Sequence, residues 1–387
     1  MRAVVANLSV PRYLLTAAHP RLGRMLSLQD DWPEPELPAA PGWVRLRPEL
    51  AGVCGSDVGV AQAKSSLVLS AFYTARHQIL GHEIVAVTET GERVVVDPIV
   101  SCRHRGFPPC RSCQDGFPYV CERFDQPGVA GCRAPSLGFD ATLGGGWGEV
   151  LVAHESQLHP VGDLPSRRAV LAEPASIALH AALHWPRRGD RAVVIGPGTI
   201  GRLVIAALRR LHAGLDITAV GPGRTGADRT LAPGPGVVET LAGLHGGRVI
   251  RPRLSQPLLE QGVDVVFDCV GLSSTIDLGL HLLRPSGMLV LVGGAGKQPV
   301  DWSLVWNRQL TVQGSVNFGP EPALGGRHTM AQVVEWLHDP AYPVDDLVTH
   351  TFGLPEWRTA LDTAAAGPRA SAVKVTLRPD PDLPLID

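Results

Sequence analysis

The feature that most constrains this chain is a short apolar segment at residues 191–196 that leads directly into the run Gly196-Pro197-Gly198-Thr199-Ile200-Gly201. The segment predicts a buried strand, and the apolar positions that continue at helical spacing to Leu211 predict a helix. In a G-x-G-x-x-G run, the first glycine permits a tight turn and the second lets the backbone approach a pyrophosphate. The third lets the helix pack on the strand. This order favours a dinucleotide-binding unit over an unliganded glycine loop.

The remainder of the chain shows two kinds of pattern. A length of 387 residues suits two domains better than one. The first 160 residues mix short apolar runs with Gly/Pro turns, which predicts a mostly β domain. From residue 191, strands alternate with helices, which predicts βαβ units and a doubly wound α/β domain with a parallel sheet. The elements predicted there are strands at 191–196, 216–221, 263–268 and 288–293, and helices at 200–211 and 274–283.

After about residue 315 the alternation fades. Helices at 330–337 and 356–366 and a last strand at 372–377 are predicted, and these segments are expected to rejoin the first domain. The expected division is a catalytic domain built from residues 1–165 and 316–387, and a dinucleotide-binding domain built from residues 166–315.

Composition limits the partners. The 35 basic and 37 acidic side chains leave a net charge of −2, which provides no electrostatic footprint for nucleic acid or an anionic membrane. No apolar stretch approaches the ~20 residues that cross a bilayer. The residues from Met1 onward predict a first strand instead of a signal sequence. We expect a cytoplasmic protein whose partners are small molecules or other copies of itself.

The end of the second predicted strand indicates which coenzyme is preferred. An acidic residue about 20 residues after the fingerprint binds the ribose 2′-hydroxyl of NAD, but this chain has Gly221 there, with Arg224 shortly after. A missing carboxylate near a guanidinium favours NADP over NAD, whereas a solvated Arg224 is the alternative. The predicted coenzyme-binding residues are Gly196, Gly198, Thr199, Ile200, Gly201, Gly221, Arg224 and Val292.

Four of the seven cysteines fall within twenty residues: Cys102, Cys110, Cys113 and Cys121. Seven cysteines are too few for a disulfide scaffold in a chain of this length, and in a reducing compartment such a cluster indicates a metal site. Free or redox-active cysteines are the alternative, but a redox-active Cys-x-x-Cys belongs near a βαβ unit, and this cluster does not lie near one. We interpret the more distant Cys132 and Cys269 as structural.

Three further motifs occur in order: Gly52-Val53-Cys54-Gly55-Ser56-Asp57, then Gly81-His82-Glu83, then Ala172-Glu173-Pro174. With the dinucleotide fingerprint, they resemble the zinc-containing medium-chain dehydrogenase/reductase family over most of the chain. The third motif resembles its polyol, glucose and threonine dehydrogenase branch. The resemblance implies a GroES-like, mostly β catalytic domain beside a Rossmann domain. It also implies a zinc-dependent alcohol dehydrogenase that moves a hydride between NAD(P) and a secondary alcohol or ketone, such as a polyol, sugar or amino alcohol.

The resemblance implies a catalytic zinc held by Cys54, His82 and Glu173, with Glu83 as a further ligand or close neighbour. One thiolate, one imidazole and one carboxylate leave a fourth position open for water or a substrate oxygen. Each residue alone has a structural alternative: a buried thiol, a core histidine, or a carboxylate at a helix N-terminus. Their joint order along the chain favours the metal.

The resemblance also implies a structural zinc. The spacing Cys110-x2-Cys113-x7-Cys121 matches the last three ligands of the family's zinc lobe, but the family's first cysteine falls at Phe107 in this chain. Cys102 is the available replacement. We therefore predict a closed site of four thiolates that includes Cys102.

The hypothesis for catalysis is that zinc acts as a Lewis acid on the substrate hydroxyl while the nicotinamide takes the hydride. Ser56 is predicted to accept a hydrogen bond from that hydroxyl, whereas helix capping is its alternative role. The family's proton-relay histidine, five residues after the zinc cysteine, is Gly59 here. His77 and His180 are relay candidates by residue type only. The predicted catalytic residues are Ser56, Cys54, His82 and Glu173.

Two other classes of protein stay open. A zinc-free NADPH reductase of the same fold, acting on quinones or activated alkenes, would lack the set formed by Cys54, His82 and Glu173, so metal analysis separates the two. A non-catalytic scaffold would bind coenzyme without turnover. The resemblance implies a homodimer or homotetramer that takes a small alcohol or carbonyl substrate.

Overall fold

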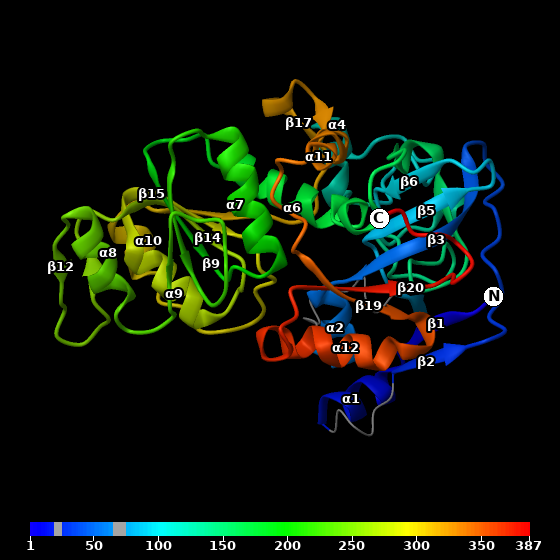
Figure 1. Cartoon of the computed structure of the whole chain (residues 1–387), viewed down its shortest axis with the longest axis horizontal. Helices are drawn as coiled ribbons and strands as arrows, with labels where there is room; N and C mark the ends of the chain where they lie inside the picture. Colours follow the sequence, from blue (N-terminus) through cyan, green and yellow to red (C-terminus); the bar gives the residue numbers. More distant parts are fainter. Residues whose placement is uncertain (19–24, 65–74) are drawn as a thin grey trace. The chain divides into compact units, whose positions relative to one another are not determined.

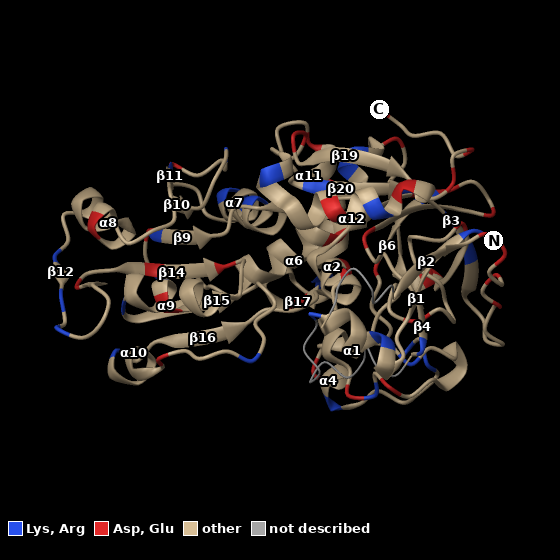
Figure 2. Cartoon of the chain, turned by 90° about the horizontal axis from the view of Figure 1, so that it is seen from below, with Lys and Arg blue, Asp and Glu red and all other residues tan. Residues whose placement is uncertain are grey.

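The computed structural model describes residues 1–18, 25–64 and 75–387 (Figure 1). The chain splits into two compact units, one formed by Met1–Glu173 with Asn317–Asp387 and the other by Pro174–Val316. Figure 2 shows that basic and acidic residues are interspersed along both units. None of the helices in the described ranges combines the length and apolarity that crossing a bilayer requires. The functional boundaries predicted after residues 165 and 315 stay a prediction.

The first unit is mostly β-structure. Its strands are β1 (Ala3–Asn7), β2 (Leu26–Gln29), β3 (Trp43–Val53), β4 (His77–Ile79), β5 (Ile84–Thr88), β6 (Arg93–Val96), β7 (Leu151–His154), β8 (Leu158–Pro160), β17 (Pro320–Glu321), β18 (Arg327–His328), β19 (Val348–Gly353) and β20 (Lys374–Arg378). Its α-helices are α1 (Val10–Ala18), α2 (Gly55–Ala61), α4 (Arg111–Gln114), α5 (Ser166–Ala169), α11 (Thr329–His338) and α12 (Trp357–Ala366). Short 3-10 turns are η1 (Pro118–Val120), η2 (Gly128–Ala130), η3 (Glu155–Gln157), η4 (Pro322–Leu324), η5 (Leu354–Glu356) and η6 (Gly367–Ala370). Helix α6 (Ala172–Leu183) begins in this unit and continues into the other.

The central strand of the first unit is β3. The main sheet has the order β19-β20-β3-β5-β6-β8, and β7 also pairs with β3. In the first half of β3, buried Trp43 and Leu46 are interspersed with partly or fully exposed residues, whereas every residue of 48–53 is buried. The strand therefore ends inside the core and delivers Cys54 there. Strand β20 pairs antiparallel with β3, so the C-terminal segment contributes a strand to the main sheet of the first unit.

The second unit is a doubly wound α/β domain, as predicted. Its strands are β9 (Arg191–Ile195), β10 (Asp216–Val220), β11 (Arg229–Leu231), β12 (Val249–Ile250), β13 (Leu258–Leu259), β14 (Val263–Asp268), β15 (Leu283–Leu291) and β16 (Thr311–Gly314). Its helices are α7 (Thr199–Leu211), α8 (Val237–His245), α9 (Ser273–Leu282) and α10 (Ser303–Asn307). The parallel sheet has the order β11-β10-β9-β14-β15-β16, which is the Rossmann strand order 3-2-1-4-5-6.

Two segments of this unit contain strands that the sequence patterns do not predict. Residues 284–287, which precede the strand predicted at 288–293, lie inside β15, where Arg284 bonds to Asp264 of the neighbouring β14 at 2.6 Å and a register shift accommodates the extra residues. The Pro/Gly-rich stretch after β10 contains the short strand β11, and no helix separates the two strands. The sequence shows no apolar periodicity in that stretch because β11 has no buried face, and the strand is formed by its pairing with β10.

Candidate functional site

Three predicted metal ligands converge at the buried end of β3. Cys54 follows β3 and precedes α2, while His82 and Glu83 immediately precede β5. Because β3 and β5 are paired, with Gly52 N donating to Glu83 O at 2.8 Å, the two segments are held side by side. Ligand atoms of Cys54, His82 and Glu83 lie within 4.8 Å of one another. His82 and Glu83 are buried and Cys54 is partly exposed, and a thiolate, an imidazole and a carboxylate so close together fit a zinc ion.

Asp57 lies beside His82 in this cluster. It is fully buried, and one of its oxygens accepts the Cys54 N–H at 2.8 Å while the other lies 3.7 Å from His82 Nδ1. With Nδ1 facing Asp57, Nε2 is the nitrogen available to a metal. Burial works against a charged imidazole, but Asp57 and Cys54 raise the pKa of His82 well above its usual range. The sequence motif contains Asp57 three residues after Cys54. An acidic residue at this spacing is typical of a side chain that caps the helix N-terminus, and here the same carboxylate also lies beside His82.

Glu83 has a second partner, Lys374 of β20, which sequence reasoning missed. The Lys374 ammonium donates to both Glu83 oxygens at 2.6 and 2.7 Å. Burial opposes the charge of Lys374, yet Glu83, Cys54 and Glu173 raise its pKa. The available signal was a lone lysine between apolar residues of a buried strand, since a charge placed there requires a partner.

Glu173 lies in the first turn of α6 and is buried. It is outside the cluster of ligand atoms within 4.8 Å, but its charge interacts with those of His82, Glu83 and Lys374. Burial raises the pKa of Glu173 to about 8, although His82 lowers it. Besides Asp57, the site therefore contains two buried glutamates, of which Glu83 lies nearer to Cys54 and His82.

Ser56 occupies the first turn of α2 and does not cap the helix, because the residue preceding the helix is Cys54. The Ser56 hydroxyl is buried and has no hydrogen-bond partner among the described residues. Gly59 also lies in α2. Of the relay candidates, His77 lies in β4 against the ring of Trp32, and His180 Nε2 faces His184 Nε2 at 3.1 Å.

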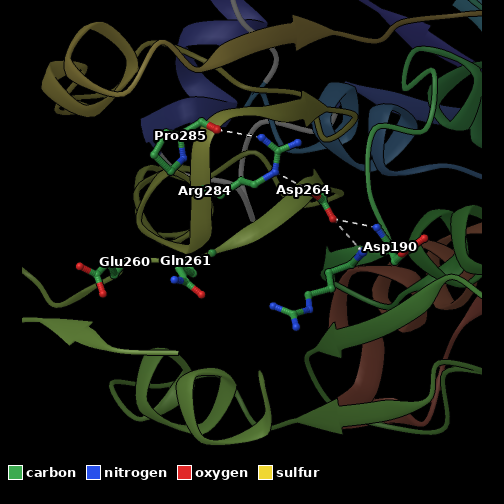
Figure 3. Close-up of a pocket in the computed structure, with 8 residues that line it drawn as sticks. Asp190, Glu260, Gln261, Asp264, Arg284 and Pro285 are labelled. Atoms are coloured by element: carbon green, nitrogen blue, oxygen red, sulfur yellow. Dashed lines mark hydrogen bonds and ion pairs between the residues drawn. The ribbon is translucent and has the colours of Figure 1, made fainter. Parts of the chain in front are cut away.

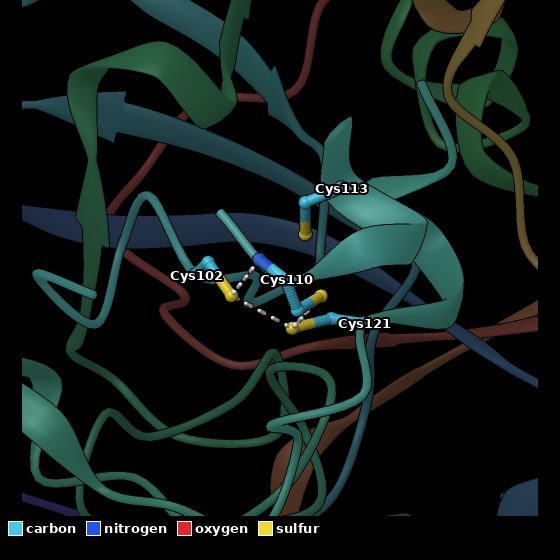
Figure 4. Close-up of side chains that lie close together, drawn as sticks. All are labelled: Cys102, Cys110, Cys113 and Cys121. Carbon is cyan, nitrogen blue, oxygen red and sulfur yellow. Dashed lines mark hydrogen bonds between the residues drawn. The ribbon is translucent and has the colours of Figure 1, made fainter. Parts of the chain in front are cut away.

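The four clustered cysteines form a second candidate metal centre, with their sulfurs turned toward one another (Figure 4). The sulfurs of Cys102 and Cys121 are 3.5 Å apart, and those of Cys110 and Cys121 are 4.0 Å apart. A zinc tetrahedron with Zn–S bonds of about 2.3 Å has edges of about 3.8 Å, so these separations fit the ion. The structure brings Cys102 to the position that a fourth thiolate requires.

The glycine fingerprint connects β9 to α7. Gly196 has φ +82°, and a Cβ there would lie 2.3 Å from Val270 Cγ2, so only glycine fits. A Cβ at Gly201 would lie 2.3 Å from Gly196 O, which is the close helix–strand packing expected of the third glycine. Gly198 directly precedes α7 and faces open space. Thr199 and Ile200 form the first turn of α7, so this loop fits a pyrophosphate at a helix N-terminus.

The end of β10 excludes a carboxylate side chain. Gly221 has φ +151°, and a Cβ there would lie 2.2 Å from Pro197 Cδ in the fingerprint itself. Arg224 is exposed in the loop that follows. Both the backbone conformation and the proline therefore explain why glycine occupies the position where an acidic residue binds the ribose hydroxyls.

Val292 lies just past β15, at the same edge of the sheet as the fingerprint. Its N–H donates to Asp268 O at 2.9 Å. The Asp268 carboxylate accepts the N–H groups of Val270 and Gly271 at 2.9 and 3.1 Å, so it holds the loop that packs on Gly196. The predicted coenzyme residues thus lie in loops at the carboxyl ends of β9, β10 and β15, where open α/β sheets bind ligands.

A polar hollow of about 530 Å³ lies at the opposite, amino-terminal edge of this sheet (Figure 3). In this hollow, the Asp264 carboxylate accepts hydrogen bonds from the N–H groups of Asp190 and Arg191, both at 2.9 Å, and forms an ion pair with Arg284. These bonds hold the starts of β9, β14 and β15 together. The hollow is therefore separate from the coenzyme loops.

Comparisons with known proteins match both units to one family. Residues 40–163 match the alcohol dehydrogenase GroES-like domain, and residues 199–339 match the zinc-binding dehydrogenase family. A zinc-type alcohol dehydrogenase-like protein of Haemophilus influenzae is 30% identical over 287 residues, covering 70% of this chain and 75% of the relative. The erythritol/L-threitol dehydrogenase of Mycolicibacterium smegmatis is 28% identical over 369 residues, covering 88% and 91%.

Solved structures show the same fold. A dehydrogenase of Escherichia coli in complex with NADH superposes with a TM-score of 0.72 at 21% identity, covering 98% of this chain and 99% of the other. A zinc-binding dehydrogenase of Sinorhizobium meliloti bound to NADP has the same TM-score, identity and coverage. The chain belongs to the zinc-type alcohol dehydrogenase family of medium-chain dehydrogenases, and it is an oxidoreductase that uses zinc and a nicotinamide coenzyme.

Proposed function

We propose that this protein interconverts a secondary alcohol and a ketone on a polyol- or sugar-like substrate, with zinc bound beside Cys54. The observation that carries the proposal is the cluster of Cys54, His82 and Glu83, whose ligand atoms lie within 4.8 Å of one another. The polyol names of relatives, such as D-arabinitol dehydrogenase and erythritol/L-threitol dehydrogenase, support the substrate class.

Zinc is held, in this proposal, by Cys54, His82 and carboxylate oxygen from Glu83 or Glu173, and when bound it polarises the substrate oxygen. The short separation of Glu83 from Cys54 and His82 supports Glu83 as the nearer ligand. Asp57 keeps the imidazole oriented, and Lys374 balances the charge of the carboxylates. The hydroxyl of Ser56, which is buried and has no hydrogen-bond partner within residues 1–18, 25–64 and 75–387, is the group that accepts a hydrogen bond from the substrate hydroxyl. Cys102, Cys110, Cys113 and Cys121 hold the structural zinc.

The coenzyme is NADP in preference to NAD. Gly221 has no room for the carboxylate that selects NAD, and Arg224 is exposed in the adjoining loop to meet a 2′-phosphate. An Arg224→Ala variant should raise the KM for NADP and leave the KM for NAD unchanged. Equal effects on both coenzymes would remove Arg224 from the site.

The assembly and cellular location complete the proposal. We assign a homodimer or homotetramer in the cytoplasm, and light scattering of the purified protein measures the subunit number. A monomer that is fully active would overturn the oligomer.

The test is a panel of polyols, simple secondary alcohols and the matching ketones, assayed with NAD and NADP by the absorbance of the reduced nicotinamide. Zinc content is measured in parallel and should be two ions per chain. Activity without zinc at the Cys54 site would favour the zinc-free quinone or enone reductase instead. Coenzyme binding without turnover on any member would favour a scaffold.

Paired variants separate the two carboxylates. Glu83→Gln and Glu173→Gln each remove one charge and keep the volume. Substitution of the glutamate that binds zinc should lower zinc retention at the Cys54 site. Substitution of the other glutamate should lower kcat while zinc stays bound. Wild-type zinc content and kcat in both variants would overturn the assignment.

A further inference from the structure

Arg105 is a fully buried arginine in the seven-residue stretch between Cys102 and Cys110. This stretch stands where the resembled family has two residues between its first zinc cysteines. The guanidinium donates hydrogen bonds to four main-chain carbonyl oxygens: Phe124 at 2.8 Å, Gln126 at 2.5 Å, Ala134 at 2.6 Å, and Cys132.

The charge of Arg105 lies near sulfur atoms. Burial lowers the pKa of Arg105, and the groups that raise it are Cys132, Cys121, Asp140 and Cys102. Zinc with four thiolates carries a net charge of roughly −2. A buried guanidinium does not lose its proton, so Arg105 stabilises that negative charge and is stabilised by it.

The main chain of Arg105 fixes the same partner segment. Its carbonyl accepts the Val129 N–H at 3.0 Å, and a Cβ on Gly128 would lie 2.1 Å from that oxygen. Residues 124–134 are therefore bound to the stretch between Cys102 and Cys110 through both the backbone and the side chain of Arg105.

The segment that Arg105 holds continues to the catalytic metal site. Val100 N donates to Pro135 O and Leu137 N donates to Pro98 O, both at 2.8 Å, so residues 135–137 pair with the stretch that leads into Cys102. Two residues later, the Phe139 ring stacks on the imidazole of His82 with centroids 5.2 Å apart and planes 28° apart. A Cβ on Gly138 would lie 2.8 Å from Gly81 O, so this contact is tight.

We infer that Arg105 is a positioning residue that connects the four-cysteine site to residues 124–139, which pack against His82 at the Cys54 site. Metal retention at the two sites is therefore coupled. Without the guanidinium, four carbonyls lose a buried donor, and the segment that carries Phe139 loses its anchor beside Cys102. His82 then loses the ring that restrains its imidazole. The inference rests on the two metal sites of the proposed function and on no assumption about the substrate.

The test measures metal release in Arg105→Met, Arg105→Lys and the control Arg103→Met, whose arginine is exposed on the same loop. Both sites are loaded with Co²⁺, and the sulfur-to-cobalt absorption distinguishes the four-thiolate ion from the one-thiolate ion. A chelator then removes the metal in the absence of substrate and coenzyme. Arg105→Met should release both ions faster, by about tenfold or more, which is typical of groups that orient metal ligands.

Arg105→Lys keeps the charge and up to three donors, so it should recover part of the retention at both sites, and Arg103→Met should match the wild type. A wild-type release rate at the Cys54 site in Arg105→Met would overturn the coupling, as would an equal effect of Arg103→Met. If Arg105→Met does not fold, the same comparison between Arg105→Lys and the wild type decides the inference. A wild-type protein that binds metal at both sites but oxidises no alcohol would sink only the proposed function.

Discussion

The ammonium of Lys374 lies 2.6 and 2.7 Å from the two carboxylate oxygens of Glu83, and both side chains are almost completely buried. The residues are 291 positions apart in the chain and meet because β20 and β5 both pair with β3. Lys374 also donates to Val53 O at 3.4 Å, one residue before Cys54. A single cation therefore braces a predicted metal ligand and the strand that supplies another.

Removing Lys374 should leave a buried carboxylate without its counter-charge. Lys374→Met is expected to lower the free energy of unfolding by about 3–5 kcal/mol, which is typical when one partner of a buried ion pair is removed. Thermal unfolding of the zinc-depleted protein measures this. The double variant Lys374→Met with Glu83→Gln should recover most of the loss, and Lys297→Met, on an exposed residue, should change nothing. Equal melting temperatures for Lys374→Met and wild type would contradict a structural role for the pair.

Gly52 leaves the space that the Glu83 carboxylate fills. A Cβ there would lie 1.6 Å from Glu83 Oε2, so Gly52→Ala should displace the carboxylate and reduce bound zinc from two ions per chain toward one. Gly55→Ala is the matched control, because a Cβ on Gly55 meets nothing within 4 Å although the residue adjoins Cys54. Atomic absorption on both proteins gives the answer. Two zinc ions retained in Gly52→Ala would show that Glu83 is not needed to hold the metal.

Asp57 is expected to contribute to metal affinity without binding the metal. Asp57→Asn still accepts the Cys54 N–H but loses the negative charge that faces His82 Nδ1. The affinity for zinc at the Cys54 site should fall by about 10–100-fold, as it does for other groups that orient ligating histidines. Chelator competition measures it, and the four-cysteine site of the same protein is the internal control. A change confined to the four-cysteine site would be the opposite of this expectation.

Coenzyme selection should depend on Pro197 and Gly221 together. Gly221→Asp alone places a side chain against Pro197 Cδ, so it should weaken both coenzymes. With Pro197→Ala in addition, the carboxylate gains room to bond to the ribose hydroxyls. The ratio of kcat/KM for NAD to that for NADP should then rise by roughly tenfold or more, the value of one charged hydrogen bond. Pro197→Ala alone is the control, and an unchanged ratio in the double variant would contradict the steric argument.

Zinc binding by the four cysteines should release protons. Burial raises the pKa of Cys113 and raises that of Cys121 to about 11, whereas N–H groups and neighbouring thiols outweigh burial and lower that of Cys110 to about 7. At pH 7.5 at least Cys113 and Cys121 are therefore thiols in the apoprotein and become thiolates with zinc. Because each zinc ion that binds releases these protons, the apparent zinc affinity should rise with pH. For two protons the rise is about 100-fold per pH unit. Competition with a chelator between pH 7 and 8.5 measures the slope, and a flat profile would refute proton release.

Local patterns in the sequence were sufficient for the α/β class, the strand–glycine loop–helix unit and the cluster of four cysteines. Each depends on residues close in the chain: the periods of strand and helix, the glycines of one turn, and thiols within twenty residues. The Pro/Gly-rich stretch around β11 and the residues 284–287 of β15 had no such periodicity, so their strands were not predicted.

Long-range pairing decided the rest. Only the pairing of β20, β3 and β5 reveals that Lys374 neutralises Glu83, and only the packing of Pro197 explains the glycine at position 221. The chain alone likewise shows Arg105 between Cys102 and Cys110 but not its four carbonyl partners. Periodicity records which face of an element is buried, whereas the partner of a buried charge depends on which distant segments the fold places against it.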